Sequence, residues 1–432
     1  MDNFNENIFS IREGELYIEE LKASELAQRF GTPLMVYSET LIRDRFIEIR
    51  REFLEKYKGA SAAYAGKAFL TPAMCRIVDE EGFHLDVVSA GELFTAKRAN
   101  FPPEKISYHG NNKTYEELDE AISSGVGRII VDGLDELTIV EELAEKHGRQ
   151  QAVLFRITPE VKAGAHSHIT TGNRDSKFGI PLDKEIIYPL IKNAIMSSFI
   201  ELKGFHFHIG SQIFDFAPFL EATKKTLEVV VNVYKHFDYA ITELVIGGGY
   251  GIRYTDAEER KPYSFFMDPI MEEMGEFCAV HGISPLHVGI EPGRSIVGNA
   301  GTTLYKIGAI KRIPGGTHFV SIDGGMSDNI RPALYDAKYE AIIANKAADS
   351  LTEKVTICGK LCESGDRIIE DLEIANPERG DILCVFSTGA YGYSMASNYN
   401  KMPKPAVVLV KGNKAELIVR RQSLEEMTQG EL

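Results

Sequence analysis

Long apolar runs are missing from this chain of 432 residues, and its basic residues are outnumbered by acidic ones. No apolar stretch approaches the roughly 20 residues that a membrane-spanning helix requires, and the amino-terminal MDNFNENIFS lacks the basic and apolar regions of a secretory signal. With 48 basic against 63 acidic residues, the net charge of −15 would repel nucleic acid. We therefore expect a cytoplasmic protein with neither a membrane nor a nucleic acid as partner.

Cysteine is also scarce, with five residues and no C-x-x-C pair. An odd number without paired spacing predicts neither a disulfide framework nor a zinc site. A cysteine with a special role would therefore have to act as a thiol. The five are Cys75, Cys278, Cys358, Cys362 and Cys384.

Eight short apolar runs alternate with helix-length amphipathic stretches, and each run ends in a polar cluster rich in Gly, His, Lys, Glu or Arg. This alternation predicts an α/β fold, a (β/α)8 TIM-type barrel, whose active site lies at the carboxyl ends of the strands. The polar clusters fall on that side, which indicates an enzyme. The runs are 62–65, 83–88, 105–109, 127–131, 152–157, 203–208, 243–248 and 286–291.

From about residue 300 the chain changes to β-rich runs with few helical intervals, which predicts a second, antiparallel β domain. Two further strand-like segments, ELYIEEL and PLMVYS, precede the first barrel helix and could join that domain. We therefore expect a barrel over residues 39–299, inserted into a β domain, a sandwich or barrel, made of 1–38 and 300–432.

Two polar clusters suggest chemistry on their own. Lys67 follows a buried-type strand, where an ammonium is costly unless it is paired or consumed in a covalent bond, although a merely solvated lysine is the alternative. Gly247, Gly248 and Gly249 follow the seventh strand, where barrels often bind phosphate, and their backbone N–H groups could approach one closely. This run is not a dinucleotide fingerprint, because Ile252 stands where the third glycine of G-x-G-x-x-G is required.

Two further clusters end the sixth and eighth strands. His206 and His208 should point to the same side by strand alternation, with Ser211 beyond them as a hydroxyl donor. They could bind a metal or stack on a flat cofactor, but no H-E-x-x-H pattern or neighbouring carboxylate set favours the metal. Glu291 and Arg294 in EPGRS lie at the mouth of the barrel, where the carboxylate needs either a cationic ligand atom or a mutual ion pair.

The β-rich part contributes candidates that are weak one by one, since cysteines there are often small core residues and loops often carry tyrosine and arginine. They come from CGKLCESGD, IRPALYDA and GAYGYSMASNYN. The candidates are Cys362, Glu363, Asp366, Arg331, Tyr335 and Tyr391.

Together the motifs resemble the fold-type III pyridoxal-phosphate decarboxylases, the group of alanine racemase and eukaryotic ornithine decarboxylase, and most closely those that act on diaminopimelate. YAGK, DVVSAGEL, HGNNK, SKFG, HIGSQ, GGGYG, EPGRS, CESGD and GAYG occur in the family's order over essentially the whole chain. The combination is far more specific than any one motif.

This resemblance implies pyridoxal 5'-phosphate as cofactor and no metal. Lys67 would form the Schiff base, His208 would stack on the ring, and Glu291 would keep the pyridine nitrogen protonated, so that the ring acts as an electron sink. Cys362 would return a proton to Cα and, with Glu363, would come from the second subunit of a homodimer with shared active sites. The residues around the phosphate would be Ser211, Gly247, Gly248, Gly249, Gly293, Arg294 and Tyr391.

Charge then favours one substrate. Ornithine presents only an ammonium at its distal end, whereas diaminopimelate presents a second amino-acid group that needs both signs. Arg294, Arg331 and Tyr335, with Tyr391 nearby, could hold the distal carboxylate, while Glu363 takes the distal ammonium. The expected reaction is decarboxylation of meso-2,6-diaminopimelate to L-lysine and CO2, the last step of lysine biosynthesis.

Three alternatives stay open. A related decarboxylase could act on ornithine or arginine, although Arg331 argues against it. A catalytically inert regulatory homologue would not need Lys67, Glu291 and Cys362 together, and a racemase would fit CESGD poorly. The loop HSHITTGNRDSKFG (166–179) has the small and polar composition of a mobile lid over the substrate.

Overall fold

The computed structural model describes residues 8–162 and 176–432, and these form two compact units. The barrel unit comprises Phe46–Gly251 and Arg260–Gly293, and the β unit comprises the chain up to Arg45, Ile252–Glu259 and Arg294–Leu432. The expected boundaries were 39 and 299. The short return of residues 252–259 into the β unit has no signal in the sequence pattern. Residues 166–175, which make up most of the loop expected to be a lid, lie outside the described residues.

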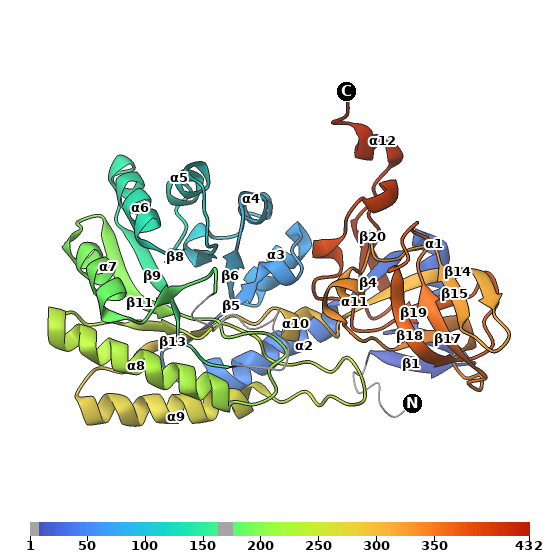
Figure 1. The fold of residues 1–432 in the computed structure, drawn as a ribbon, viewed down its shortest axis with the longest axis horizontal. Helices are drawn as coiled ribbons and strands as arrows, with labels where there is room; N and C mark the ends of the chain where they lie inside the picture. Colours follow the sequence, from blue (N-terminus) through green and yellow to red (C-terminus); the bar gives the residue numbers. More distant parts are fainter. Residues whose placement is uncertain (1–7, 163–175) are drawn as a thin grey trace. The chain divides into compact units, whose positions relative to one another are not determined.

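The barrel unit contains eight parallel strands that close on themselves, because the last strand pairs with the first (Figure 1). Each predicted apolar run overlaps one of them, and a two-residue strand, β10 (Ile180–Pro181), pairs with β9. The (β/α)8 barrel is therefore confirmed. In hydrogen-bonded order the strands are β5 (Ala60–Ala65), β6 (His84–Val87), β7 (Ile106–Tyr108), β8 (Arg128–Val131), β9 (Gln151–Thr158), β11 (Ile200–His206), β12 (Glu243–Val245) and β13 (His287–Ile290).

Helices connect consecutive strands and cover the barrel's outer face (Figure 1). Several polar residues that follow the strands cap the first turns of these helices. Thr71 accepts a hydrogen bond from Met74 N and Ser89 accepts one from Glu92 N, while Thr114 and Glu117 form a capping box. The helices are α2 (Glu39–Ile49), α3 (Pro72–Glu80), α4 (Ala90–Arg98), α5 (Tyr115–Ser123), α6 (Leu134–Lys146), α7 (Lys184–Met196), α8 (Ala217–Phe237) and α9 (Tyr263–His281).

The β unit is built on a mostly antiparallel sheet in which β14, β4 and β20 are central. β4 pairs antiparallel with β14 and parallel with β20, so the amino-terminal strand does join the carboxyl-terminal ones, as the sequence suggested. A second parallel pairing joins β15 to β17. The strands are β4 (Leu34–Ser38), β14 (Gly301–Arg312), β15 (His318–Ile322), β16 (Ala341–Ile343), β17 (Glu353–Cys358), β18 (Arg367–Ile374), β19 (Ile382–Val385), β20 (Ala406–Lys411) and β21 (Lys414–Val419).

Smaller elements complete the β unit. A separate three-stranded antiparallel sheet precedes α1, and apolar residues of both contribute to a core with β4 and β20. No helix among the described residues is long and apolar enough to span a membrane. These elements are β1 (Phe9–Arg12), β2 (Glu15–Ile18), β3 (Leu21–Lys22), α1 (Ala23–Phe30), α10 (Arg294–Val297), α11 (Arg331–Tyr335) and α12 (Leu424–Thr428).

An ion pair spans the amino-terminal end of the barrel, opposite the end where the motifs lie. Arg128 begins β8 and Glu243 begins β12, and the guanidinium donates both Nε and Nη2 to the carboxylate at 2.8 and 2.7 Å. Burial opposes ionisation of Glu243, but the hydrogen bonds from Arg128 outweigh it and hold the pKa of the carboxyl below its ordinary value. The pair therefore ties two non-adjacent strands together.

Glu243→Gln should lower the free energy of unfolding by about 1–3 kcal/mol, because it leaves a largely buried guanidinium without its charged partner. Since the pKa of Glu243 is depressed in the folded state, its contribution should be present at neutral pH and disappear as acid protonates the folded carboxylate. Urea unfolding at several pH values measures this. Glu120→Gln, which breaks the exposed pair with Lys97 in the same unit, is the matched control and should change little. Equal effects of the two variants would contradict the prediction.

Candidate active site

Lys67 lies at the carboxyl end of β5, in a short 3-10 turn formed by Gly66–Ala68. Its side chain is exposed, as in the alternative of a solvated lysine, so burial does not make the ammonium costly here. It nevertheless faces carboxyl groups: burial raises the pKa of Asp86 and of Glu291, and the positive charge of Lys67 opposes both shifts. The turn needs glycine at position 66, because a Cβ there would lie 2.7 Å from the carbonyl oxygen of Asp86. The amine is therefore accessible, and its charge interacts with the carboxyl groups of Asp86 and Glu291.

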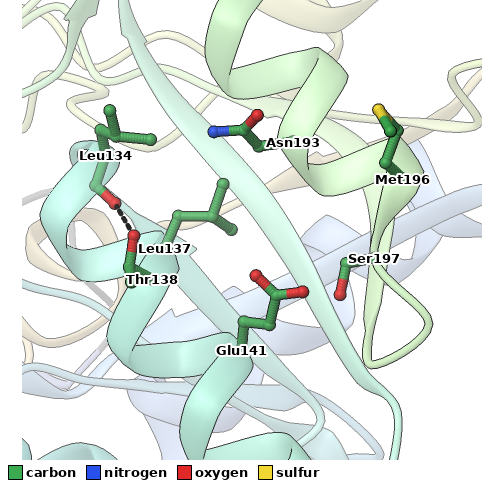
Figure 2. A pocket seen from close by; sticks show the side chains of 7 residues that line it. All are labelled: Leu134, Leu137, Thr138, Glu141, Asn193, Met196 and Ser197. Carbon is green, nitrogen blue, oxygen red and sulfur yellow. Dashed lines mark hydrogen bonds between the residues drawn. The ribbon is translucent and has the colours of Figure 1, made fainter.

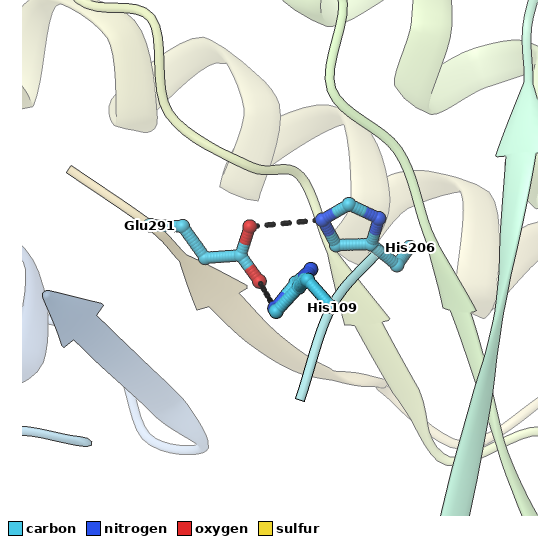
Figure 3. A group of neighbouring side chains, drawn as sticks. All are labelled: His109, His206 and Glu291. Carbon is cyan, nitrogen blue, oxygen red and sulfur yellow. Dashed lines mark hydrogen bonds and ion pairs between the residues drawn. The ribbon is translucent and has the colours of Figure 1, made fainter. Parts of the chain in front are cut away.

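Glu291 follows β13 and is held by two buried histidines from other strands (Figure 3). His206 Nε2, at the end of β11, lies 2.8 Å from Glu291 Oε2, and His109 Nε2, just after β7, lies 3.4 Å from Oε1. The two rings meet edge to face with their centroids 5.0 Å apart. The sequence showed no carboxylate near His206 because Glu291 is distant along the chain and close only in the closed barrel.

Asp86 completes this group from the end of β6. Its Oδ1 lies 3.5 Å from His109 Nε2, and neither atom has a hydrogen-bond partner among the described residues. Burial lowers the pKa of His109 to about 4, and burial together with the charge of Glu291 raises the pKa of Asp86 well above its ordinary value. The imidazole of His109 is therefore neutral at neutral pH, and burial favours the protonated form of Asp86.

His208 and the glycine run pack against one another. A Cβ on Gly247 would lie 2.9 Å from His208 Nδ1, and Cβ atoms on Gly248 and Gly249 would overlap the carbonyl oxygens of Glu291 and Gly210. Gly247 and Gly249 also adopt positive φ, at 70° and 111°. Only glycine fits these positions.

The same glycines leave backbone donors available. Across the described parts of the chain, the N–H groups of Gly247, Gly248 and Gly249 donate no hydrogen bond to a protein acceptor. Ser211, in the turn after β11, and Gly293, after β13, are the other barrel-unit residues predicted to surround a phosphate; Ser211 is half-buried and Gly293 is buried. Unused N–H groups beside a tight glycine turn form the kind of concavity that binds an anion.

Two arginines meet at one tyrosine in the β unit. Arg294 Nη1 and Arg331 Nη1 both donate to the Tyr254 hydroxyl, at 2.5 and 2.9 Å, and Arg331 Nη1 also donates to the Tyr339 hydroxyl at 2.6 Å. The guanidinium of Arg294 also stacks on the ring of Tyr391, 4.8 Å from its centroid. Tyr254 and Tyr339 were not foreseen from the sequence, because tyrosines in RYTD and AKYE have no distinguishing pattern.

Arg331 is buried, yet no carboxylate in the described chain forms an ion pair with it. Burial opposes its charge, but the oxygens of Tyr254 and Tyr339 raise its pKa above the ordinary value, so it stays cationic. Tyr335, the last residue of α11, is only partly buried. A buried cation held by neutral hydroxyls retains its attraction for an anionic ligand.

The CESGD loop presents its first two residues to solvent. Cys362 and Glu363 are exposed, whereas Asp366 is buried and accepts hydrogen bonds from Met326 N at 2.6 Å and Leu361 N at 3.0 Å. Asp366 therefore organises the loop. The thiol and the neighbouring carboxylate are left accessible for chemistry.

A pocket on the outside of the barrel unit, between α6 and α7, lacks the chemistry that a phosphate or carboxylate would need (Figure 2). No lysine, arginine or histidine lines it. Its lining residues are Leu134, Leu137, Thr138, Glu141, Asn193, Met196 and Ser197.

Comparisons with known proteins agree with this geometry. Residues 41–298 match the family model described as pyridoxal-dependent decarboxylase, pyridoxal binding domain. The chain is 45% identical to diaminopimelate decarboxylase of Bacillus subtilis over 97% of this chain and 95% of the relative. The crystal structure of diaminopimelate decarboxylase from M. jannaschii in complex with L-lysine superimposes with a TM-score of 0.92 at 36% identity, covering 99% of this chain and 98% of the other.

A more distant structure shows the fold alone. The lysine/ornithine decarboxylase of Vibrio vulnificus, solved with putrescine, has a TM-score of 0.76 at 22% identity and covers 90% of this chain and 97% of its own.

Proposed function

This chain belongs to the pyridoxal-dependent decarboxylases, and we propose that it removes one carboxyl group from meso-2,6-diaminopimelate, releasing CO2 and leaving L-lysine. This reaction is the last step of lysine biosynthesis. The observation that carries the substrate choice is Arg331, a buried cation that pairs with no carboxylate of the described chain. Two relatives that are 45% and 46% identical to this chain, each matched over 95% of its own length, are diaminopimelate decarboxylases.

The residues of the barrel unit fit pyridoxal 5'-phosphate. The amine of Lys67 would hold the cofactor covalently, the ring of His208 would lie against it, and the unused N–H groups of Gly247, Gly248 and Gly249 would bind its phosphate. Glu291 would face the pyridine nitrogen with its negative charge. When bound, the cofactor takes up the electron pair that is left on Cα as the carboxyl group departs.

Further residues would complete the phosphate site. Ser211 and Gly293 would add a hydroxyl and a close backbone approach, Arg294 would add a positive charge, and Tyr391, which stacks on Arg294, would orient it.

Residues of both positive and negative charge would recognise the distal end of the substrate. Arg331 and Arg294, fixed by the shared Tyr254 hydroxyl, would hold the distal carboxylate, and Tyr335 would add a hydroxyl. Glu363 would hold the distal ammonium. Ornithine offers no carboxylate at that end, so it would leave Arg331 buried without a counter-ion.

The reaction ends with a proton returned to Cα. The bond between Cα and the carboxyl carbon breaks, CO2 leaves, and the Cys362 thiol supplies the proton that replaces it. We propose that Cys362 and Glu363 reach the substrate of a second subunit, so that the protein acts as a homodimer with shared active sites. Their exposure in the CESGD loop supports this arrangement. The cytoplasmic location stays a prediction.

Purified protein supplied with pyridoxal phosphate should release CO2 and form L-lysine from meso-diaminopimelate, and should be inactive towards ornithine and arginine. Lys67→Ala is the blank. Turnover of ornithine or arginine instead would keep the fold and cofactor but overturn the role of Arg331. No turnover of any of the three would favour an inert homologue.

Replacement of Arg331 should affect recognition more than chemistry. Arg331→Met should lower kcat/KM for diaminopimelate by about a hundredfold or more, mainly through KM, because a charge-assisted contact of roughly 1.5–3 kcal/mol is lost along with orientation. Steady-state kinetics measure this. Arg367→Met, at an exposed arginine of the same unit, is the matched control. An unchanged KM in Arg331→Met would contradict the assignment.

Subunit mixing tests the shared site. Lys67→Ala and Cys362→Ala should each be almost inactive alone, but mixed dimers should regain activity, because one of their two sites contains both native residues. Activity is measured after mixing under conditions that allow subunits to exchange. If mixing restores nothing although exchange is demonstrated with labelled chains, Cys362 acts within its own subunit.

A further inference from the structure

His109 and His206 contact Glu291 and have no part in the function proposed above (Figure 3). Both are buried, with exposed fractions of 6% and 1%, and they come from different strands that converge on one carboxylate. Burying an imidazole with an unpaired nitrogen costs free energy, because that nitrogen loses its hydration without gaining a hydrogen bond. His206 Nδ1 is such an atom, since it has no partner among the described residues.

We propose that His206 is a positioning residue for Glu291: as a neutral donor it fixes one carboxylate oxygen and keeps the group ionised without cancelling the charge that the cofactor nitrogen needs. His109 supports the other oxygen more weakly. The inference rests on the proposed function, through the role of Glu291 towards pyridoxal phosphate.

The hydrogen-bond pattern sets the tautomer of His206. Nε2 lies 2.8 Å from Glu291 Oε2, and Nδ1 has no partner. A proton on Nδ1 alone would leave a buried donor unpaired and would place the Nε2 lone pair against a carboxylate oxygen. The proton therefore sits on Nε2 and is donated to Glu291. Oε1 has only the longer 3.4 Å approach of His109, so it keeps capacity for another donor.

Neutrality of the donor is the second part of the argument. Burial lowers the pKa of His206 well below its ordinary value, and the neighbouring charges of Arg156 and Lys67 act in the same direction. A lysine or arginine in this place would form an ion pair with Glu291 and neutralise it. A neutral imidazole instead stabilises the carboxylate by one hydrogen bond and leaves its charge for the pyridine nitrogen.

The remaining groups around Glu291 are consistent with this role. Burial and the charge of Glu291 raise the pKa of Asp86, on β6, which favours its neutral form, and His109, after β7, is neutral. Lys67, after β5, and Arg156, on β9, are the positive charges that face the carboxylate. Within the described chain neither cation forms a hydrogen bond or ion pair with Glu291, whereas His206 contacts it directly.

The test uses holoenzyme loaded with pyridoxal phosphate labelled with nitrogen-15 in the ring, and follows the protonation of that nitrogen by solid-state NMR across a pH series. His206→Leu should lower the pH at which the nitrogen loses its proton by about one unit or more, the tenfold effect expected for one hydrogen bond to a charged group. His206→Gln, which keeps an N–H donor of similar reach, should restore most of the difference. His109→Leu should have a smaller effect.

Controls separate the possible outcomes. Glu291→Gln shows the effect of losing the charge altogether, and His84→Leu replaces a histidine at the opposite end of the barrel and should match the native enzyme. If His206→Leu does not bind the cofactor, His206→Met takes its place. A shift in Glu291→Gln without one in His206→Leu would overturn this inference alone, as would a His206→Gln enzyme that behaves like His206→Leu. No shift in Glu291→Gln would overturn the proposed role of Glu291 and the inference with it.

Discussion

Pairing of β13 with β5 is the contact on which the candidate site depends, because it closes the barrel. Lys67 follows β5 and Glu291 follows β13, so the first and last strands of the barrel carry the amine and the carboxylate as neighbours. Closure also brings the ends of β7 and β11 inward, and with them His109 and His206. An open sheet with the same strands would leave these groups on opposite edges.

Much of this arrangement could be predicted from the sequence. Each of the eight barrel strands overlaps a predicted apolar run, because parallel strands buried on both faces read as short apolar segments. The motif order also identified the family. β16 and β18 have no clear strand pattern in the sequence, because Ala341–Ile343 has only three residues and Arg367–Ile374 is interrupted by charged residues.

Contacts between groups on different strands could not be predicted from the sequence. His206 was considered as a metal ligand and set aside for want of a carboxylate, yet Glu291 lies 2.8 Å away across the barrel. Asp86, His109, Tyr254 and Tyr339 have ordinary local surroundings, and only the fold shows what they touch. The exposure of Lys67 could not be predicted either, because a buried strand does not determine the exposure of the residue that follows it.

The two units hold ions of opposite sign, a carboxylate in the barrel unit and a guanidinium in the β unit. In each unit the ligand group proposed to bind there carries the opposite charge. In the barrel unit a largely buried carboxylate is approached closely by neutral histidines, which keeps its negative charge available for a cationic ring nitrogen. In the β unit a buried guanidinium is approached by neutral tyrosine hydroxyls, which keeps its positive charge available for a carboxylate. Each charged group is fixed by hydrogen bonds but not neutralised. The free-energy cost of burying each ion is then recovered only when a ligand of the opposite sign binds, which favours a substrate that carries a carboxylate at its distal end over one that does not.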